Sequence, residues 1–133
     1  MIIKSFELNK IKLKNYKLFL FYGDNEGLKE ETIRDLFEKS YQDKIHRYEE
    51  KEILDDINSF FNSVLTKSFF DNEKLIIINR ATDKIKETVE DLIEKNPVDI
   101  KIILNSKNLE KKSTLRKIFE KEKSIICVPF YED

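Results

Sequence analysis

Four short segments of almost continuously apolar residues constrain the fold of this chain more than any other feature of its sequence. They are residues 18–22 (LFLFY), 75–78 (LIII), 100–104 (IKIIL) and 125–128 (IICV). Their length and their β-branched and aromatic content are typical of strands that are buried on both faces, as in parallel sheets. We expect a weaker strand at 45–48, and the partial alternation of the first 16 residues indicates an edge strand or hairpin.

Amphipathic helical patterns separate these strands. Apolar residues recur at spacings of three and four over four segments, 28–37, 53–65, 85–93 and 115–119. Residues that favour N-cap positions precede the first, third and fourth patterns, namely Asp24 or Asn25, Thr82 or Asp83, and Ser113. Strands that alternate with such helices predict right-handed crossovers, and therefore an α/β three-layer sandwich around a mostly parallel five-stranded sheet.

The composition narrows the class of protein further. With two glycines and two prolines the sequence contains no flexible linker, so we expect a single domain over residues 1–133. The 25 basic and 26 acidic residues balance, which argues against a strong overall attraction to DNA or to an anionic membrane. No apolar run approaches the ~20 residues that span a bilayer, no signal peptide is recognisable, and Cys127 has no disulfide partner. A cytoplasmic protein is therefore expected.

The stretch YGDNEGLKEE follows a predicted strand and opens a predicted helix, as a phosphate-binding loop does. Counted from Gly23, Lys29 occupies the lysine position of that motif, but Leu28 and Glu30 replace its second glycine and its hydroxyl residue, and Gly27 comes one position early. Leucine blocks the approach of a phosphate to the backbone, and the carboxylate repels it. We interpret Gly23, Gly27 and Lys29 as a degenerate phosphate loop, and we expect no cofactor.

Other catalytic patterns are incomplete. The strand at 75–78 is followed by Asn79 and Arg80, neither of which can act as the general base of a nucleotide hydrolase. Asn105 follows the next strand, where related ATPases often place a polar phosphate sensor. His46 has no cysteine neighbour with which to bind a metal ion, and no serine lies in a G-x-S-x-G pattern. We predict a non-catalytic binding domain without a metal site. The alternative is a small P-loop ATPase or kinase-like nucleotide-binding domain that uses the degenerate loop.

Two adjacent phenylalanines, Phe69 and Phe70, follow the second predicted helix in the stretch SFFDNEK. We take Ile57 as the centre of the apolar stripe of that helix. The residues that then face the core, within about 80° of this centre, include Phe60, Phe61, Val64 and Leu65. Continuing the same helix places Phe69 at the margin of the stripe and Phe70 on the solvent side, and an exposed aromatic pair is typical of a protein-docking anchor. The alternative is that the helix ends near Lys67 and the loop folds one or both rings under the sheet.

Four stretches carry a resemblance to a known family by their order and spacing: LFYGDNEGLKEE, SFFDNEKLIIINRATDK, NLEKKSTLRKIFEK and CVPFYED. Together they resemble the N-terminal domain of the delta subunit of the bacterial DNA polymerase III clamp loader. The resemblance covers about residues 17–133 and implies an AAA+-like P-loop fold that has lost ATP binding. Members of the family carry two further helical domains, a lid and a collar, which this sequence lacks.

The resemblance implies a non-enzymatic part of the DNA polymerase III holoenzyme that acts in DNA replication. The delta subunit opens the beta sliding clamp by inserting a hydrophobic plug, approximately Q-x-x-S-L-F, into a pocket of the clamp. The matching stretch here is LTKSFF, in which Leu65 replaces the glutamine, whereas Ser68, Phe69 and Phe70 occupy the last three positions. The implied partners are the beta sliding clamp and, in the full-length protein, the delta prime and gamma/tau subunits; no membrane partner is implied.

A lysine-rich stretch surrounds the fourth predicted helix. Within it, Arg116, Lys117 and Lys112 are candidates for contact with a neighbouring subunit or for a weak contact with DNA. The alternative is a solvated helix face with salt bridges to Glu110 and Glu120. Because Arg116 lies in one of the resembling stretches, the sequence does not separate a contact role of this residue from a role in the fold.

Overall fold

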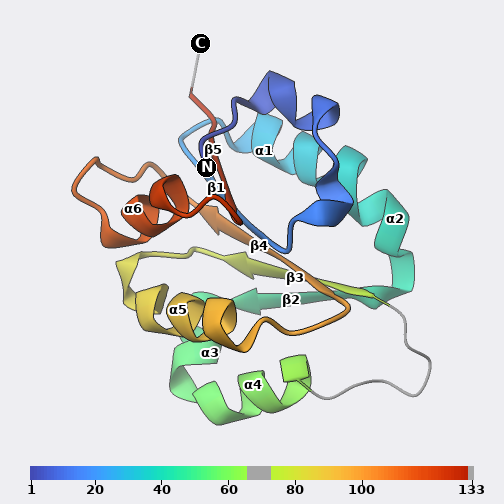
Figure 1. Cartoon of the computed structure of the whole chain (residues 1–133), viewed down its shortest axis with the longest axis vertical. Coiled ribbons are helices and arrows are strands. Elements are labelled where there is room, and N and C mark those ends of the chain that lie inside the picture. Colours follow the sequence, from blue (N-terminus) through green and yellow to red (C-terminus); the bar gives the residue numbers. More distant parts are fainter. Residues whose placement is uncertain (66–72, 132–133) are drawn as a thin grey trace.

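The computed structural model describes residues 1–65 and 73–131 (Figure 1). Five strands form one sheet, and they are β1 (Leu18–Tyr22), β2 (Ile45–Glu49), β3 (Lys74–Asn79), β4 (Ile100–Ser106) and β5 (Ile126–Pro129). All neighbouring strands are parallel, and the strand order is β2-β3-β4-β1-β5. The predicted α/β architecture with a five-stranded parallel sheet is confirmed, including the weaker strand at 45–48.

The helices cover both faces of this sheet (Figure 1). One face carries α1 (Glu26–Ile33), a π-helical turn (Arg34–Glu38) and α2 (Lys39–Tyr41). The other face carries α3 (Glu50–Asp55), α4 (Ile57–Leu65), α5 (Lys86–Lys95) and α6 (Thr114–Lys121). The placement of the helices on two faces follows from the strand order. The connection from β1 to β2 crosses the sheet toward one edge, and the connections from β2 through β3 and β4 to β5 cross it toward the other edge. Right-handed crossovers in opposite directions place their helices on opposite faces.

The strands separate two apolar cores. Along β1, Leu18, Leu20 and Tyr22 belong to the core under α3 to α6, whereas Phe19 and Phe21 belong to the core under α1. The ring of Phe37 meets both of these phenylalanines edge to face, with ring centroids 5.0 and 5.9 Å apart. Burial on both faces explains why the central strands read as continuous apolar runs. Within the described ranges, no helix has the length and apolar content needed to cross a membrane.

Two of the three predicted caps start α-helices, and the third, Thr82, caps a 3₁₀ turn by accepting from the amide of Lys84. The side chain of Asn25 accepts from the amide of Leu28 at 3.1 Å and caps α1. The hydroxyl of Ser113 accepts from the amide of Arg116 at 3.2 Å and caps α6. A 3₁₀ turn, Asp83–Ile85, leads into α5, and Asn96 ends α5 in the left-handed conformation. These polar residues therefore fix where the helices begin and end.

The first 16 residues differ from the predicted edge strand or hairpin. They form two 3₁₀ helices, Ser5–Lys10 and Leu13–Asn15, and a single bridge between Ile2 and Cys127. Leu8 is fully buried between this segment and the sheet. The prediction was wrong because the apolar residues of this segment anchor a coil to the face of the sheet, and their spacing only partly resembles strand alternation.

The second predicted helix also differs, because it is two helices. Asp56 leaves the helical conformation with φ −151° and ψ 78°, and its carboxylate accepts from the amide of Ser59 at 3.0 Å, which starts α4 anew. Phe60 and Val64 are buried as predicted, but Ile57 and Leu65 are 40% and 44% exposed. Ile57 is therefore not the centre of the apolar stripe, and the prediction that Leu65 faces the core was wrong.

Candidate functional site

The loop between β1 and α1 occupies the place of a phosphate-binding loop, at the carboxyl ends of the strands. Gly23 has φ 128°, a conformation that residues with a side chain rarely adopt, and its amide donates to the carbonyl of Lys107 at 3.2 Å. A Cβ atom at this position would lie 2.0 Å from the carbonyl oxygen of Phe130. The chain that leaves β5 therefore lies directly against the first turn of the loop.

Several amides of this loop donate to acceptors within the domain. The amide of Asn25 donates to the carbonyl of Phe130 at 3.3 Å, and that of Glu26 to the carbonyl of Asp24 at 2.9 Å. The side-chain amide of Asn25 also donates to the carbonyl of Tyr131 at 3.3 Å. A phosphate-binding loop instead directs such free amides toward the anion. This arrangement favours the interpretation that the loop is structural.

Lys29 of α1 is completely buried. Its ammonium donates to the carbonyl of Ser106 at 2.6 Å and to the carboxylate of Glu26 at 2.9 Å, which occupies two of its three N–H groups. The lysine thus ties α1 to the end of β4 instead of projecting toward a ligand. Gly27 lies on the exposed side of α1, and a Cβ atom there would meet nothing within 4 Å.

Polar residues follow the neighbouring strands at the same edge. Asn105 donates to the side chain of Asn79 at 3.2 Å, and Arg80 forms an ion pair with Glu49. These residues, with Glu26 and Glu30 of α1, line a hollow of about 410 Å³. In the part of the chain that the structure describes, no three acidic, histidine or cysteine side chains are grouped as metal ligands. His46 is exposed on the edge strand β2.

Of the predicted clamp-binding residues, Ser68, Phe69 and Phe70 lie outside the described residues. Leu65, the last residue of α4, is exposed, so its side chain is available for contact with another protein. The two ends that flank this stretch are fixed to the domain. Lys74, the first residue of β3, donates to the carbonyl of Ser63 at 2.7 Å, and Tyr41 donates to Glu73 at 2.7 Å.

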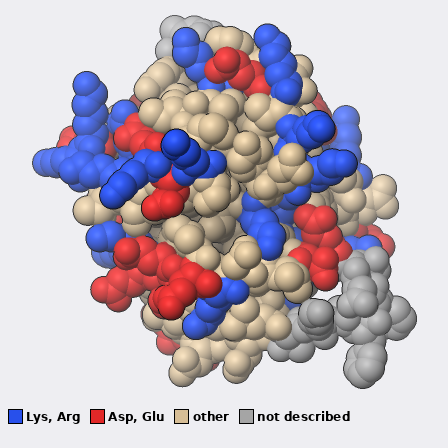
Figure 2. Space-filling view, in the orientation of Figure 1, with Lys and Arg blue, Asp and Glu red and all other residues tan. Residues whose placement is uncertain are grey.

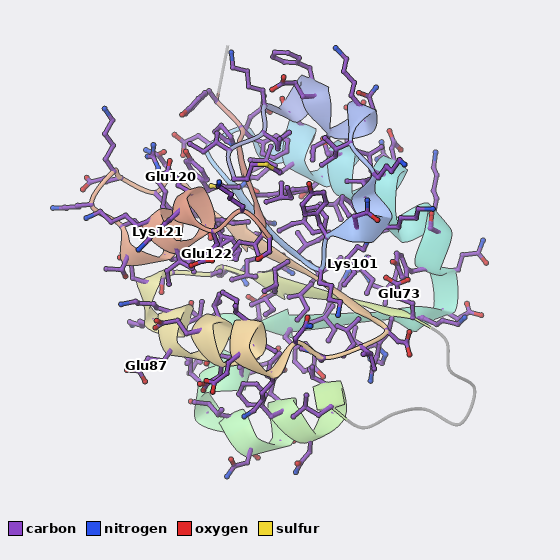
Figure 3. All side chains as sticks on the ribbon, viewed as in Figure 1. Glu73, Glu87, Lys101, Glu120, Lys121 and Glu122 are labelled. Carbon is purple, nitrogen blue, oxygen red and sulfur yellow. The ribbon has the colours of Figure 1, made fainter. Side chains whose placement is uncertain are left out.

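Two charged residues, Glu73 and Lys101, lie near the amino ends of β3 and β4 (Figure 3). Burial and the bond to Glu73 raise the pKa of Tyr41 above its ordinary value. Lys101 is buried beneath the N-terminal segment, where it donates to the carbonyl of Leu13 at 2.6 Å and lies over the ring of Phe19. Its burial lowers its pKa. The bonds from Tyr41 to Glu73 and from Lys101 to Leu13 hold α2 and the second 3₁₀ helix, which lie on the same face as α1, to this end of the sheet.

The three basic residues of the lysine-rich stretch lie in different environments. The guanidinium of Arg116 donates to the carbonyl of Leu109 at 2.8 Å and to Glu120 at 3.1 Å, and it lies 5.0 Å from the ring centre of Tyr22. Through these contacts Arg116 stabilises the packing of α6 against β1 and the loop before α6. Lys117 and Lys112 are exposed, and Lys112 pairs with Glu110 at 3.4 Å. Figure 2 shows the basic side chains interspersed with acidic ones on this face of the molecule.

Two sets of hydrogen bonds from acidic side chains were not predicted from the sequence. The carboxylate of Asp83 accepts from the hydroxyl of Ser113 at 2.6 Å and from the amide of Leu115 at 3.1 Å, and the first of these bonds lowers its pKa. Buried Glu50 accepts from both the amide and the hydroxyl of Thr82, at 2.6 and 2.8 Å. Both are contacts between residues about 30 positions apart, which no local pattern reveals.

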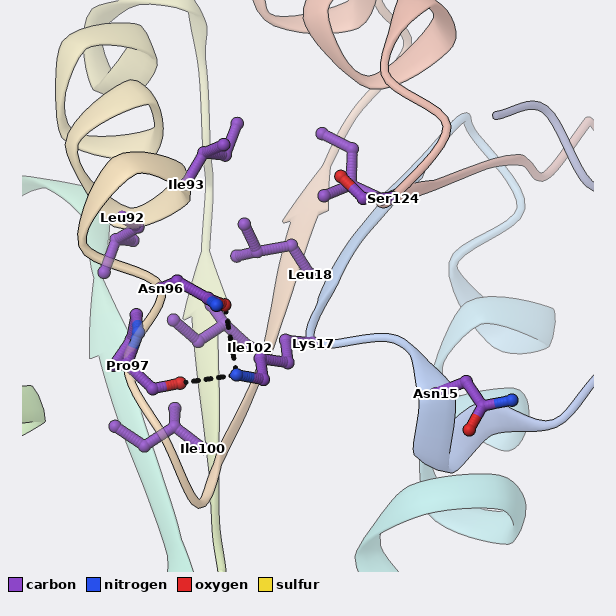
Figure 4. A pocket seen from close by; sticks show the side chains of 11 residues that line it. Asn15, Lys17, Leu18, Leu92, Ile93, Asn96, Pro97, Ile100, Ile102 and Ser124 are labelled. Atoms are coloured by element: carbon purple, nitrogen blue, oxygen red, sulfur yellow. Dashed lines mark hydrogen bonds between the residues drawn. The ribbon is translucent and has the colours of Figure 1, made fainter.

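A second hollow, of about 210 Å³, lies at the opposite, amino edge of the sheet (Figure 4). Its floor is apolar and includes Leu18, Ile100 and Ile102. Lys17 donates across its rim to the side chain of Asn96 and to the carbonyl of Pro97, both at 3.0 Å. These bonds join the end of α5 to the start of β1, so the polar residues of the rim stabilise the fold.

The five parallel strands in the order β2-β3-β4-β1-β5, with helices on both faces, define a three-layer α/β domain. The family described as "DNA polymerase III, delta subunit" matches residues 19–128. The chain therefore belongs to the DNA polymerase III delta subunit family.

A solved structure supports the same fold. The structure titled "Bacillus subtilis DNA clamp loader delta protein (YqeN)" superposes with a TM-score of 0.72 and 17% sequence identity. The alignment covers 97% of the present chain and 43% of that chain, so the present chain spans less than half the length of that relative. No curated protein sequence matches the chain at the significance that we required.

Proposed function

We propose that residues 1–133 form the N-terminal, clamp-binding domain of a clamp-loader delta subunit. In this proposal the domain binds the beta sliding clamp through Ser68, Phe69 and Phe70, with Leu65 at the border of the contact, and helps to open the ring. The observation that carries the proposal is membership of the delta subunit family over residues 19–128. The role places the protein in the cytoplasm, in a complex with the delta prime and gamma/tau subunits.

The frame around the proposed plug suits a mechanical role. The last residue of α4 is exposed, and the first residue of β3 is tied back to Ser63 of the same helix. Force on the plug is therefore passed to α4 and to a strand that lies inside the sheet. Opening then needs no chemistry in this domain, because binding of the plug favours a geometry of the clamp interface that does not close. Release follows when partner subunits hydrolyse ATP.

The domain itself is proposed to be non-catalytic. The amide of Asn25 and the ammonium of Lys29 already have internal acceptors, so these two donors are not free for a phosphate. Titration calorimetry with ATP and magnesium tests this point against the alternative of a small P-loop ATPase or kinase-like domain. Saturable binding that Lys29→Ala abolishes, in a variant that remains folded, would establish the alternative.

The clamp contact is tested by the double substitution Phe69→Ala and Phe70→Ala. Truncated hot-spot residues typically cost about 2–4 kcal/mol each in binding, so we expect affinity for the cognate clamp to fall at least a hundredfold. Phe6→Ala is a matched control, because Phe6 is 68% exposed and lies in the N-terminal segment. Surface plasmon resonance measures the affinities, and circular dichroism confirms folding. Unchanged clamp affinity of the folded double variant contradicts the proposal.

We propose only a weak contact with DNA, through the exposed residues Lys112 and Lys117. The salt dependence of binding to a short primed duplex tests it, because each phosphate contact that is lost reduces the slope of log affinity against log salt by about one. Arg116 is a poor candidate for this contact because its guanidinium is bonded to Leu109 and Glu120.

A further inference from the structure

The N-terminal segment, residues 1–16, carries a charge opposite to that of the rest of the chain. It contains four lysines and one glutamate, which leaves 21 of the 25 basic and 25 of the 26 acidic residues to the remainder. The overall balance of charge therefore hides a local positive excess. Several basic side chains lie at the upper right of Figure 2, where Figure 1 places this segment. Such an excess attracts anionic partners even when the net charge does not.

The packing of the segment leaves its lysines in solvent. Ile11 and Leu13 are half-buried and pack against the core under α1, whereas Lys10, Lys12 and Lys14 are exposed. The backbone at Ile11 and Lys12 is extended, so successive side chains there point to opposite sides. The alternation that resembles an edge strand in the sequence therefore presents three closely spaced lysines to solvent.

The charges of these lysines are not used within the domain. Lys10, Lys12 and Lys14 form no ion pair in the described ranges. Three acidic side chains on the same face of the sheet have other partners, and these pairs are Asp35 with Arg34 and Lys39, Glu38 with Arg47, and Glu73 with Tyr41. The three lysines are therefore available to an external anion.

An exposed aromatic ring lies in the same segment. Phe6, in the first 3₁₀ helix, is 68% exposed and is the most exposed large apolar side chain of the described residues. The ammonium of Lys4 lies 5.8 Å from the centre of this ring. Because a 3₁₀ helix rises about 2 Å per residue, Phe6 lies about 8 Å along the helix from Lys10. A flat apolar face and several positive charges thus occupy one short stretch of surface.

This combination selects a single nucleic-acid strand among anionic partners. Proteins that bind such strands combine positive side chains along the backbone with aromatic rings on which bases stack. The bases of a duplex are already stacked on one another, so an isolated surface ring has no base to receive. An anionic membrane is disfavoured because Leu8, Ile11 and Leu13 pack against the sheet, whereas a membrane-binding segment inserts its apolar residues into the lipid.

We propose that residues 4–14 form a binding surface for single-stranded nucleic acid. Lys10, Lys12 and Lys14 contact phosphates, and the ring of Phe6 stacks on a base. This surface goes beyond the proposed function, because it lies on the face of the sheet that carries α1. The weak DNA contact proposed above lies beside α6, on the other face. Contacts to phosphates and to the flat face of a base do not depend on the base sequence, so the surface binds strands of any sequence.

The experiment is a titration of a labelled oligothymidylate of about 20 nucleotides with the domain, followed by fluorescence anisotropy at several salt concentrations. We expect saturable binding that weakens as salt rises. The triple substitution Lys10→Gln, Lys12→Gln and Lys14→Gln is expected to weaken binding about tenfold or more. It should also reduce the slope of log affinity against log salt by about two, since each phosphate contact of a single strand contributes about 0.7. Oligouridylate of the same length distinguishes DNA from RNA, because only the latter has 2′-hydroxyl groups.

Two further variants separate stacking from charge. Phe6→Ala is expected to weaken binding about fivefold or more with the salt slope unchanged, because stacking involves no phosphate. The control is the triple substitution of Lys51, Lys84 and Lys121 by glutamine, which removes the same charge from exposed positions on the other face. We expect this control to change affinity less than about threefold. Urea denaturation confirms that all variants remain folded.

Three results would overturn the proposal: no saturable binding at about 50 mM salt, equal losses in the two triple variants, or unchanged affinity of Phe6→Ala. Sedimentation with phosphatidylglycerol vesicles tests the other polyanion. Vesicle binding that Phe6→Ala abolishes, without oligonucleotide binding, would assign the surface to a membrane. The double substitution of Phe69 and Phe70 is expected to leave oligonucleotide binding unchanged, and Phe6→Ala to leave clamp binding unchanged. Failure of this proposal and failure of clamp binding are therefore separate results.

Discussion

The two glycines of the chain are expected to respond in opposite ways to substitution by alanine. At Gly23 the backbone has φ 128°, and the added Cβ atom would lie 2.0 Å from the carbonyl oxygen of Phe130 and 2.7 Å from its carbonyl carbon. At Gly27, within α1, the added atom would meet nothing within 4 Å. The pair is therefore a matched test of whether the chain after β5 is packed against the first loop.

The expected magnitudes follow from these distances. A residue with a side chain at such a φ costs about 1–3 kcal/mol, and forcing backbone apart to admit an extra methyl group costs about 1–3 kcal/mol more. Separation of the two segments also weakens the bond from the amide of Asn25 to Phe130, worth about 0.5–1.5 kcal/mol. We therefore expect Gly23→Ala to lower the free energy of unfolding by about 3–5 kcal/mol. Gly27→Ala is expected to raise it by about 0.5–1 kcal/mol, because alanine is the better helix former.

Urea denaturation followed by far-ultraviolet circular dichroism measures both changes. For a domain of this size, about 1 kcal/mol corresponds to roughly 3–5 °C in Tm, so Gly23→Ala is expected to melt at least 10 °C below the parent domain. The reasoning is refuted if Gly23→Ala loses less than about 1 kcal/mol, since strain at this φ alone predicts more. It is also refuted if Gly27→Ala destabilises the domain to the same extent.

Two further predictions concern the ends of α6 and α4. Asp83→Asn is expected to cost about 1 kcal/mol near neutral pH, because Ser113 and Leu115 lose a charged acceptor. The pKa of Asp83 is lowered in the folded state, so its contribution is present above the ordinary pKa of 3.8 and lost as pH falls through the folded value. The variant and the parent should therefore differ fully above about pH 4 and converge only as the pH falls further, through the lowered pKa of Asp83, as urea denaturation at several pH values can show. Leu65→Gln restores the family glutamine at a 44% exposed position; we expect tighter clamp binding by surface plasmon resonance and stability within about 0.5 kcal/mol of the parent. Weaker clamp binding would show that the glutamine contact of the family does not apply here.

The parts of the fold that depend on local patterns could be predicted from the sequence. The apolar runs identified the strands, and Asn25 and Ser113 marked helix starts where the structure has them. The break at Asp56 was missed because Ile53, Ile57 and Phe60 keep helical spacing across it, and spacing does not register one residue that leaves the helix. The burial of Leu65 was then misjudged from the same wrong centre. The prediction of an edge strand or hairpin in the N-terminal segment was wrong because the position of this segment depends on the tertiary packing of Leu8, which a local pattern does not reveal.

The candidate sites divide in the same way. The mismatches of the phosphate motif at Leu28 and Glu30 are visible in the sequence, but the internal bond of Lys29 to Ser106 joins residues 77 positions apart and requires the fold. The hollow at the carboxyl edge is likewise assembled from the ends of several strands. No local pattern signals that the hydroxyl of Ser106 is left without a partner, because that property belongs to its surroundings. The residues Ser68, Phe69 and Phe70 remain a prediction from sequence.

The contact between Gly23 and Phe130 bears on the evolutionary reversibility of this domain. Replacing Leu28 by glycine and Glu30 by serine would rebuild the letters of a phosphate loop. The amide of Asn25 would still donate to Phe130, and the chain leaving β5 would still cover the first turn. A nucleotide in the usual place would need a new path for this segment, which is more than 100 residues away in sequence. We therefore expect that these two substitutions alone do not create a nucleotide-binding site.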